Sequence, residues 1–320
     1  MKEIKIYLQN EFDEFQQVFN AAVQSQVSLL DKIMKYVVRS KGKQLRPMFV
    51  MLSAKICGEI NPVTYRAASL IELLHTATLV HDDVVDDADE RRGFFSLNAL
   101  WKNKIAVLVG DYLLSKGLLL SLGNQDFHIL EILAKAVKEM SEGELLQIEK
   151  ARKLDITEAI YFDIIRCKTA SLISSACAAG AYSAKQDTQM ADKMALFGEK
   201  AGIAFQIKDD LFDYGTDNVG KPTGNDIREK KMTLPLIYTL HHCNAAIKRS
   251  IISIFKKKKN TKEDVQFVIQ QVIDHGGIKY AEETMQRFVL EALEILNTFD
   301  PGEARNHMER LINYTVLRKK

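Results

Sequence analysis

Two clusters of aspartates, each following an apolar stretch, constrain this chain more than any other feature. They are Asp82, Asp83 and Asp86, after the apolar run Leu70–Val80, and Asp209, Asp210 and Asp213. Residues four apart on an α-helix share a face, so Asp82 and Asp86 point the same way, as do Asp209 and Asp213. Stacked like charges weaken a helix, and a divalent cation would offset that cost. An isolated cluster is more simply a solvated helix end, but two of them favour a metal-binding function.

The arrangement of these clusters predicts one cavity with two carboxylate walls. Each cluster ends a long apolar helix and is followed by a loop with cations. If the two helices face each other across a bundle, the carboxylates line a site of a known kind. Hard oxygen ligands suit Mg²⁺, which usually binds through one or two carboxylates and the phosphates of a substrate. The expected ligand is therefore a diphosphate held by metal ions.

The rest of the chain predicts an all-α protein. Only five prolines interrupt 320 residues, and no stretch shows strand-type alternation. No linker or short-period repeat divides the chain, so we expect a single domain over residues 1–320. Helices are expected over about 1–38 (two amphipathic helices), 48–57, 63–87, 99–122, 126–150, 155–182, 190–214, 234–242 and, as smaller helices, within 245–320.

Composition excludes several other classes of protein. The net charge of +2 gives no indication of nucleic-acid binding. The four cysteines are scattered without metal-ligand spacing and are expected to be reduced thiols. The N-terminus lacks the apolar segment of a signal peptide, and no uncharged run reaches the length of a membrane span. We therefore expect a cytoplasmic protein without a stable membrane anchor.

Cations gather near helix ends and beside the aspartates. They are Lys43, Arg46, Arg91, Arg92, Lys168, Lys221 and Lys231. Arginine presents a bidentate fork to phosphate, and lysine a compact charge. Metals and cations together indicate a highly charged anionic ligand, and two such ligands if the cations form separate sets. For Lys231 the spacing fits an ordinary surface charge equally well.

With these motifs the sequence resembles the trans-isoprenyl diphosphate synthases, the head-to-tail polyprenyl synthase family. The matching segments are Gly42–Pro47, the first aspartate motif with Arg91-Arg92-Gly93, Gly110-Asp111, Lys168-Thr169, Phe205-Gln206 with the second motif, and Gly220–Asp226. The resemblance implies the isoprenoid synthase fold, with ten or more helices around a central cavity and two facing aspartate-rich motifs. It also implies a homodimer, with two or three Mg²⁺ ions bound together with the substrate diphosphate.

The resemblance also implies roles for individual residues. Asp82 and Asp86, with Asp83 in support, resemble the metal ligands for the allylic diphosphate, and Asp209 resembles the ligand from the opposite wall, with Asp210 and Asp213 nearby. Arg91, Lys168 and Lys221, together with Lys231, resemble the clamp on the allylic diphosphate. Lys43, Arg46, His75 and Arg92 resemble the isopentenyl diphosphate site, and Thr169 and Gln206 lie where the family stabilises the allylic cation. One departure is Gln44, where many members have a basic residue.

The implied reaction joins isopentenyl diphosphate to an allylic diphosphate, with farnesyl diphosphate as the expected primer. Metals and cations neutralise the departing diphosphate, so the allylic C–O bond ionises. The cation needs a dry site lined by neutral dipoles. The double bond of isopentenyl diphosphate then attacks, and the departing diphosphate is the expected proton acceptor, because no side-chain base stands out.

Product length is expected to depend on Ala77 and Thr78, five and four residues before Asp82. Short-chain members of the family typically place a bulky aromatic residue there as a floor. Ala77 leaves none, which favours an all-trans product longer than C15, of the class used for quinone side chains. Alternatively, Ala77 is a packing residue, a later side chain such as Leu114, Leu118 or Leu119 closes the tunnel, and the product is the C15 or C20 of farnesyl or geranylgeranyl diphosphate synthases.

Three further functions fit the sequence less well. Terpene cyclases and head-to-head synthases also use aspartates and Mg²⁺, but they lack the Lys43–Arg46 segment. A non-catalytic subunit of a heteromeric synthase usually loses aspartates, whereas both motifs are intact here. A metal-dependent phosphohydrolase could use the pair His81-Asp82, but it needs histidine ligands upstream, and only His75 precedes it.

Overall fold

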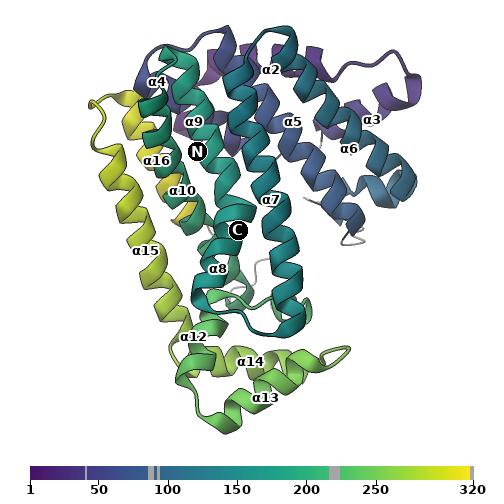
Figure 1. The fold of residues 1–320 in the computed structure, drawn as a ribbon, viewed down its shortest axis with the longest axis vertical. Coiled ribbons are helices and arrows are strands. Elements are labelled where there is room, and N and C mark those ends of the chain that lie inside the picture. Colours follow the sequence, from purple (N-terminus) through teal and green to yellow (C-terminus); the bar gives the residue numbers. More distant parts are fainter. Residues whose placement is uncertain (40–41, 86–89, 92–93, 216–223, 318–320) are drawn as a thin grey trace. The chain divides into compact units, whose positions relative to one another are not determined.

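The structure is a computed structural model that describes residues 1–39, 42–85, 90–91, 94–215 and 224–317. Nearly all of its regular structure is helical (Figure 1), which confirms the all-α prediction. A short antiparallel pairing joins β1 (Glu90–Arg91) to β2 (Phe94–Phe95), and the sequence gave no indication of it. The chain divides into two compact units: unit 1 comprises residues 1–137, 172–195 and 298–308, and unit 2 comprises residues 138–171, 196–297 and 309–320. Each unit is described by itself.

Unit 1 is built on two helices, α4 and α5, most of whose side chains are buried. In α4, side chains are buried on every face from Pro47 to Ala54, which is the pattern of a central helix. The helices of this unit are α1 (Lys2–Tyr7), α2 (Gln9–Val23), α3 (Ser28–Arg39), α4 (Leu45–Cys57), α5 (Pro62–Val85), α6 (Leu97–Gly123), the first part of α7 (Phe127–Lys153), α9 (Ser171–Lys185), and the beginnings of α10 (Thr188–Leu211) and α16 (Glu303–Leu317).

The helix that carries the first aspartates, α5, has clear local signals. Pro62 occupies its first position, where a fixed φ is favourable. Asn61 precedes it and accepts a hydrogen bond from the Val63 backbone N–H at 2.9 Å. Its buried face then runs from Thr64 to Asp83. The expected helix over residues 63–87 is thus confirmed as far as Val85, after which residues 86–89 lie outside the described part.

Unit 1 also contains a long apolar helix with an exposed face. Helix α6 begins after Ser96, whose side chain accepts a hydrogen bond from the Ala99 N–H at 3.0 Å, and it is interrupted at Lys102, where φ is 70°. By length and apolar content α6 could cross a membrane, although 33% of that segment is buried inside the molecule. The expectation concerned uncharged runs, and α6 carries Lys102, Lys104, Asp111 and Lys116, so the length and apolar content of α6 do not contradict it.

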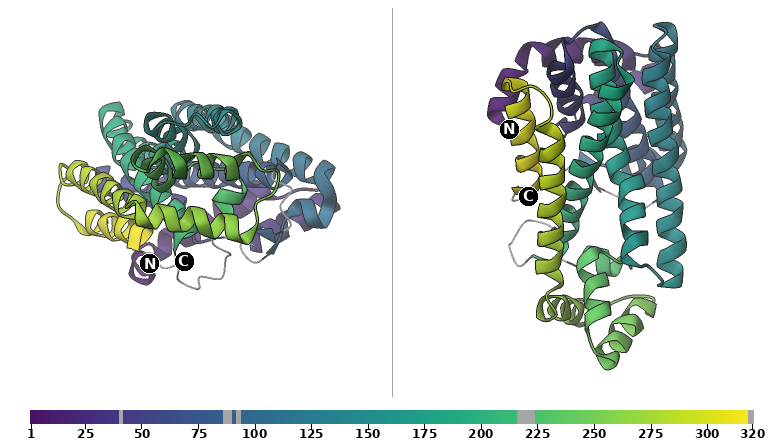
Figure 2. Two further views of the ribbon diagram at one scale, coloured as in Figure 1. Left: turned by 90° about the horizontal axis from the view of Figure 1, so that it is seen from below. Right: turned by 60° about the vertical axis from the view of Figure 1, so that its left-hand side comes forward.

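Unit 2 carries the second aspartate motif. Its elements are the remainder of α7, α8 (Glu158–Ile165), a π-helical turn (Arg166–Ala170), the remainder of α10, a 3₁₀ turn (Phe212–Tyr214), α11 (Asn225–Arg228), α12 (Leu234–His242), α13 (Ala245–Lys256), α14 (Lys262–Asp274), α15 (Gly277–Leu296) and the end of α16. In Figure 2 the green helices α12, α13 and α14 lie together beside one end of α15.

Candidate active site

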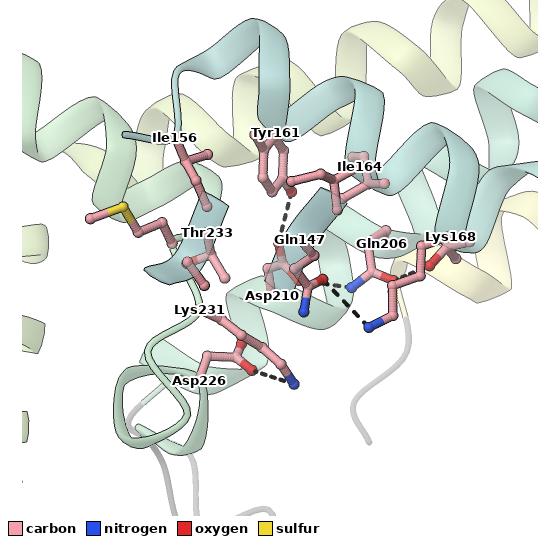
Figure 3. A pocket seen from close by; sticks show the side chains of 14 residues that line it. Gln147, Ile156, Tyr161, Ile164, Lys168, Gln206, Asp210, Asp226, Lys231 and Thr233 are labelled. Atoms are coloured by element: carbon pink, nitrogen blue, oxygen red, sulfur yellow. Dashed lines mark hydrogen bonds and ion pairs between the residues drawn. The ribbon is translucent and has the colours of Figure 1, made fainter. Parts of the chain in front are cut away.

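Unit 2 contains a cavity of about 180 Å³ that gathers several of the predicted site residues. Lys168, Thr169, Gln206, Asp210 and Lys231 all line it, together with apolar side chains from α8 (Figure 3). These residues come from the π turn, from α10 and from the segment before α12. The sequence prediction had therefore selected residues that lie together, although they are up to 63 positions apart in the chain.

Lys168 and Thr169 lie on a π turn that the sequence did not predict. We expected one helix over residues 155–182, but the Ser171 N–H donates to the Arg166 carbonyl five residues back. Two glycines from neighbouring helices pack against this turn. A Cβ on Gly143 of α7 would lie 2.7 Å from the Cys167 Cβ, and a Cβ on Gly202 of α10 would lie 2.6 Å from the Ala170 Cα. Such turns inside helices are frequent at functional sites, and here two neighbouring helices fit closely around the turn.

A chain of three hydrogen bonds crosses the cavity wall. The Thr169 hydroxyl donates to Gln206 Oε1 at 2.6 Å, and Gln206 Nε2 donates to Asp210 Oδ1 at 2.8 Å. The Tyr161 hydroxyl, from α8, donates to Asp210 Oδ2 at 2.7 Å. Figure 3 shows Tyr161 above Asp210, with Gln206 beside it. Thr169 and Gln206 are thus hydrogen-bonded to each other, Tyr161 joins them through Asp210, and their role as neutral dipoles for the allylic cation stays a prediction.

The carboxylates of the cavity are held in an environment that disfavours their charge. Burial, and next the charge of Asp226, raise the pKa of Asp210 to about 7. Burial, and next the charge of Asp213, raise the pKa of Asp226 to about 6, against the opposing effect of Lys231. Perturbed carboxylates of this kind cluster at functional sites. An added cation would lower both pKa values by favouring the charged forms.

Asp213 links the second motif to the segment that follows it. Its Oδ1 accepts a hydrogen bond from the Asn225 N–H at 2.8 Å, and its Oδ2 accepts one from the Asp226 N–H at 3.0 Å. The carboxylate therefore caps the first turn of α11. Asp209, half-buried, lies one turn earlier on α10. A carboxylate oxygen has further lone pairs, so these hydrogen bonds leave Asp213 able to bind a metal.

Both lysines of the cavity pair with carboxylates. Lys168 forms an ion pair with Glu144 of α7, and its Nζ lies 3.4 Å from Gln147 Oε1. The Nζ of Lys231 lies 2.5 Å from Glu229 Oε2 and 3.9 Å from Asp226 Oδ1. Lys231 is thus part of the cavity, where the sequence alone fitted a surface charge equally well.

Unit 1 brings together two residues of the predicted isopentenyl diphosphate site. Arg46 Nη1 of α4 lies 2.9 Å from His75 Nε2 of α5. His75 is only 7% exposed, whereas Lys43 is exposed. A guanidinium held by a buried histidine is oriented before any anion arrives.

Asp82 and Asp83 of the first aspartate motif, and the pair Ala77 and Thr78 that is predicted to set product length, lie on the last turns of α5. Asp82 is half-buried and Asp83 is 4% exposed. Ala77 is fully buried, and Thr78 donates a hydrogen bond to the His75 carbonyl at 2.9 Å. Asp86, Arg92 and Lys221 lie outside the described residues, and of Arg91 only the backbone is described. The two aspartate motifs belong to different units, and that they face each other stays a prediction.

The donor set fits Mg²⁺ without forming a complete protein site. Within the described ranges, no group of three or more His, Cys, Asp or Glu side chains could hold a metal ion by itself. The available donors are carboxylate oxygens, the hard ligands that Mg²⁺ prefers. Asp82 in unit 1, and Asp209, Asp213 and Asp226 in unit 2, are therefore suited to metal ions that complete their coordination with substrate phosphates and water.

Sequence reasoning missed three residues of this site: Tyr161, Glu144 and Asp226. Asp226 lies within the Gly220–Asp226 segment that carries the family resemblance, so the motif itself could have given it a role. Tyr161 and Glu144 approach from α8 and α7 through tertiary packing, and no spacing in the sequence indicated them.

Comparisons with known proteins give matches over most of the chain. The polyprenyl synthetase family model matches residues 27–272. An all-trans-nonaprenyl-diphosphate synthase (geranyl-diphosphate specific) of Rhodobacter capsulatus is 36% identical over 96% of this chain and 94% of its own length. A solved decaprenyl diphosphate synthase from Rhodobacter capsulatus superposes with a TM-score of 0.94, at 31% identity, over 99% of this chain and 98% of that one. A solved geranylgeranyl pyrophosphate synthase from Bacteroides thetaiotaomicron gives 0.85 at 35% identity, over 98% of both chains.

Proposed function

Because the chain belongs to the polyprenyl synthetase family, we propose that it is a prenyltransferase that adds isopentenyl diphosphate units head-to-tail to an allylic diphosphate. The observation that carries the proposal is the Thr169–Gln206 pair beside Lys168 in the cavity of unit 2. A cation for the diphosphate and a neutral dipole for the carbocation are what this reaction needs within a few ångströms of each other.

Each substrate has its own set of residues in this proposal. The allylic diphosphate is bound by Asp82, Asp86, Asp209, Arg91, Lys168, Lys221 and Lys231, and isopentenyl diphosphate by Lys43, Arg46, His75 and Arg92. Mg²⁺ bound with the allylic diphosphate would neutralise the charge of the leaving group. Lys168 adds a compact charge whose position is fixed by Glu144 and Gln147. Two separate sets hold the reacting carbons in register, which supplies much of the rate enhancement.

The chain's own groups then protect the allylic cation. The oxygens of Thr169 and Gln206 turn their negative ends toward it, while the apolar side chains of α8 exclude water from the cavity. The double bond of isopentenyl diphosphate attacks the cation, the new C–C bond forms, and a proton leaves to the departing diphosphate. The cytoplasmic location and the use of farnesyl diphosphate as primer are parts of the same proposal.

The length of the product is the more specific part of the proposal. Two of the similar proteins are named for nonaprenyl and decaprenyl products, and one for the shorter geranylgeranyl product. Ala77, which is fully buried, supports the longer class, because its methyl group is too small to serve as the floor that a bulky aromatic side chain would provide. We propose a product longer than C15.

One assay tests the reaction. Purified protein is incubated with Mg²⁺, labelled isopentenyl diphosphate and either geranyl or farnesyl diphosphate, and the products are sized by chromatography. We expect elongation beyond C20. Absence of elongation with every primer would overturn the proposed reaction, whereas products that stop at C15 or C20 would overturn only the chain-length part.

Ala77→Phe is expected to shorten the main product by one or more isoprene units. The ring would occupy the space beside α5 along which the chain is proposed to grow. Thr76→Phe is the matched control, because Thr76 is the half-buried neighbour of Ala77 on the same helix. Product lengths are compared at matched turnover, after circular dichroism has established that both variants are folded. An unchanged product from Ala77→Phe would place the floor elsewhere.

We also propose that the protein is a homodimer, and that a second copy covers the exposed face of α6. This face presents Leu100, Leu108, Leu118, Leu119 and Leu122, all at least 43% exposed. Such an apolar stripe is unusual on a monomer, and the family resemblance implies a dimer. Leu119→Glu is expected to convert the dimer to a monomer in light scattering at micromolar concentration. Leu290→Glu on α15 is the control, since Leu290 is exposed to a similar degree, 60% against 64%. A dimer that survives Leu119→Glu would exclude this surface.

A further inference from the structure

We propose that Tyr161 and Asp210 act as positioning residues that fix the direction of the Gln206 amide, so that oxygen lone pairs rather than N–H groups face the reacting allylic cation. This inference rests on the proposed function. In this proposal Asp210 orients the Gln206 amide and is not a metal ligand. Tyr161 acquires a role that nothing in the sequence suggested.

The direction of the amide follows from the hydrogen bonds of Asp210. Both oxygens of Asp210 accept hydrogen bonds, Oδ2 from the Tyr161 hydroxyl and Oδ1 from Gln206 Nε2, at 2.8 Å. The amide N–H groups of Gln206 are therefore turned toward Asp210. Its Oε1 then points the other way and accepts from the Thr169 hydroxyl at 2.6 Å. With its proton committed to Gln206, Thr169 can offer only lone pairs to a further group.

Tyr161 fixes the second oxygen of the Asp210 carboxylate. Its hydroxyl donates to Asp210 Oδ2 at 2.7 Å, and both side chains are buried, Tyr161 at 3% and Asp210 at 6% exposure. Each carboxylate oxygen thus has one partner, and the carboxylate cannot rotate without breaking a buried hydrogen bond. The cost of leaving such a group unsatisfied is what fixes the geometry.

A reversed amide would have the opposite electrostatic effect. If Gln206 turned its Nε2 toward Thr169, the amide N–H groups would direct their positive ends at the cavity. A carbocation beside them would be destabilised, whereas the carbonyl and hydroxyl oxygens stabilise it. All four members, Tyr161, Thr169, Gln206 and Asp210, line the cavity directly.

The chain of contacts predicts a specific coupling between variants. Tyr161→Phe removes the hydroxyl that fixes Asp210, and we expect kcat to fall about 10-fold with the KM for both substrates within about 2-fold, because the interaction matters only as the cation develops. In a Gln206→Ala background the same Tyr161→Phe change should have little effect, because the group that it positions is gone. An equal loss in both backgrounds, or no loss in either, would overturn the proposal.

Tyr280→Phe is the matched control. The Tyr280 hydroxyl also donates to a carboxylate on α8, Glu158 Oε1 at 2.6 Å, but neither residue lines the cavity. We expect wild-type kcat from this variant. An equal fall in kcat for Tyr280→Phe and Tyr161→Phe would mean that anchoring of α8, and not the amide, is responsible, and would overturn the proposal.

Asp210→Asn provides a second, isosteric test that preserves the size of the side chain. Tyr161 and Gln206 donate to different oxygens of Asp210, and asparagine replaces one of these acceptors with an NH₂ donor, so one of the two hydrogen bonds must be lost or rearranged. We expect a fall in kcat at least as large as that of Tyr161→Phe, with the melting temperature reported alongside. Wild-type kcat from Asp210→Asn would contradict a positioning role. Absence of elongation by the unsubstituted protein would be a failure of the proposed function, and it is separated from these outcomes by the first assay.

Discussion

Asp82→Ala is expected to lower kcat for elongation by about 10³-fold, the loss typical of removing a group that stabilises charge in the transition state. Asp82 lies on the last turn of α5, half-buried and one turn after Thr78. Its removal takes one of the proposed metal ligands from the diphosphate site. Steady-state rates at saturating substrate and several Mg²⁺ concentrations measure the effect.

Asp82→Ala is expected to change the free energy of unfolding little, although it lowers kcat strongly. Asp82 adds to a local excess of negative charge, so alanine is expected to alter the free energy of unfolding by less than about 0.5 kcal/mol, and favourably if it relieves repulsion. Asp13→Ala on α2 is the control, because Asp13 is an exposed aspartate of the same unit. Near-normal turnover by Asp82→Ala would contradict the proposed metal role.

Gly202→Ala is expected to have the second largest effect, although the residue touches no substrate. The added Cβ would lie 2.6 Å from the Ala170 Cα and 2.8 Å from the Ala170 Cβ. These are not the ends of flexible side chains, so the π turn that carries Lys168 and Thr169 must move. A displacement of about 1 Å in a catalytic group can cost about 10²-fold in rate, and overpacking costs about 1–3 kcal/mol of stability.

Gly123→Ala separates these effects from the general consequences of replacing a helical glycine. A Cβ at Gly123 would have no neighbour within 4 Å, so alanine there should stabilise the helix slightly or have no effect. Chemical denaturation and kcat are measured for both variants. If Gly202→Ala kept full kcat, the geometry of the π turn would not matter for the reaction.

The aspartate-bearing helices could be predicted because their signals are local. Helix α5 has a proline and an asparagine at its start and an apolar face along its length. The cavity residues Lys168, Thr169 and Gln206 could be named because they belong to motifs that resemble a family. Their gathering around one cavity is what the resemblance implied for this part of the chain.

The remainder depends on contacts between elements, which no local pattern contains. The π turn arises where Gly143 and Gly202 allow two helices to approach residues 166–170, and glycines in helices have many other uses. In the sequence Tyr161 is indistinguishable from an ordinary aromatic residue of the core, and only the fold places its hydroxyl beside Asp210. Long-range partners of this kind decide the orientation of a catalytic group, and they are found only in the folded structure.

The capping of α11 by Asp213 has a consequence for how proteins of this kind can vary. Three hydrogen bonds, from the N–H groups of Gly224, Asn225 and Asp226, converge on Asp213. These hydrogen bonds hold Gly224 close to Asp213, and so they join the two ends of the segment between Tyr214 and Gly224. Closing a loop that is twice as long costs only about 0.6 kcal/mol. Changes of length beside Lys221 could therefore be accepted within this segment while the Asp213 carboxylate stays in place, whereas Lys221 itself, proposed to bind the allylic diphosphate, must be kept.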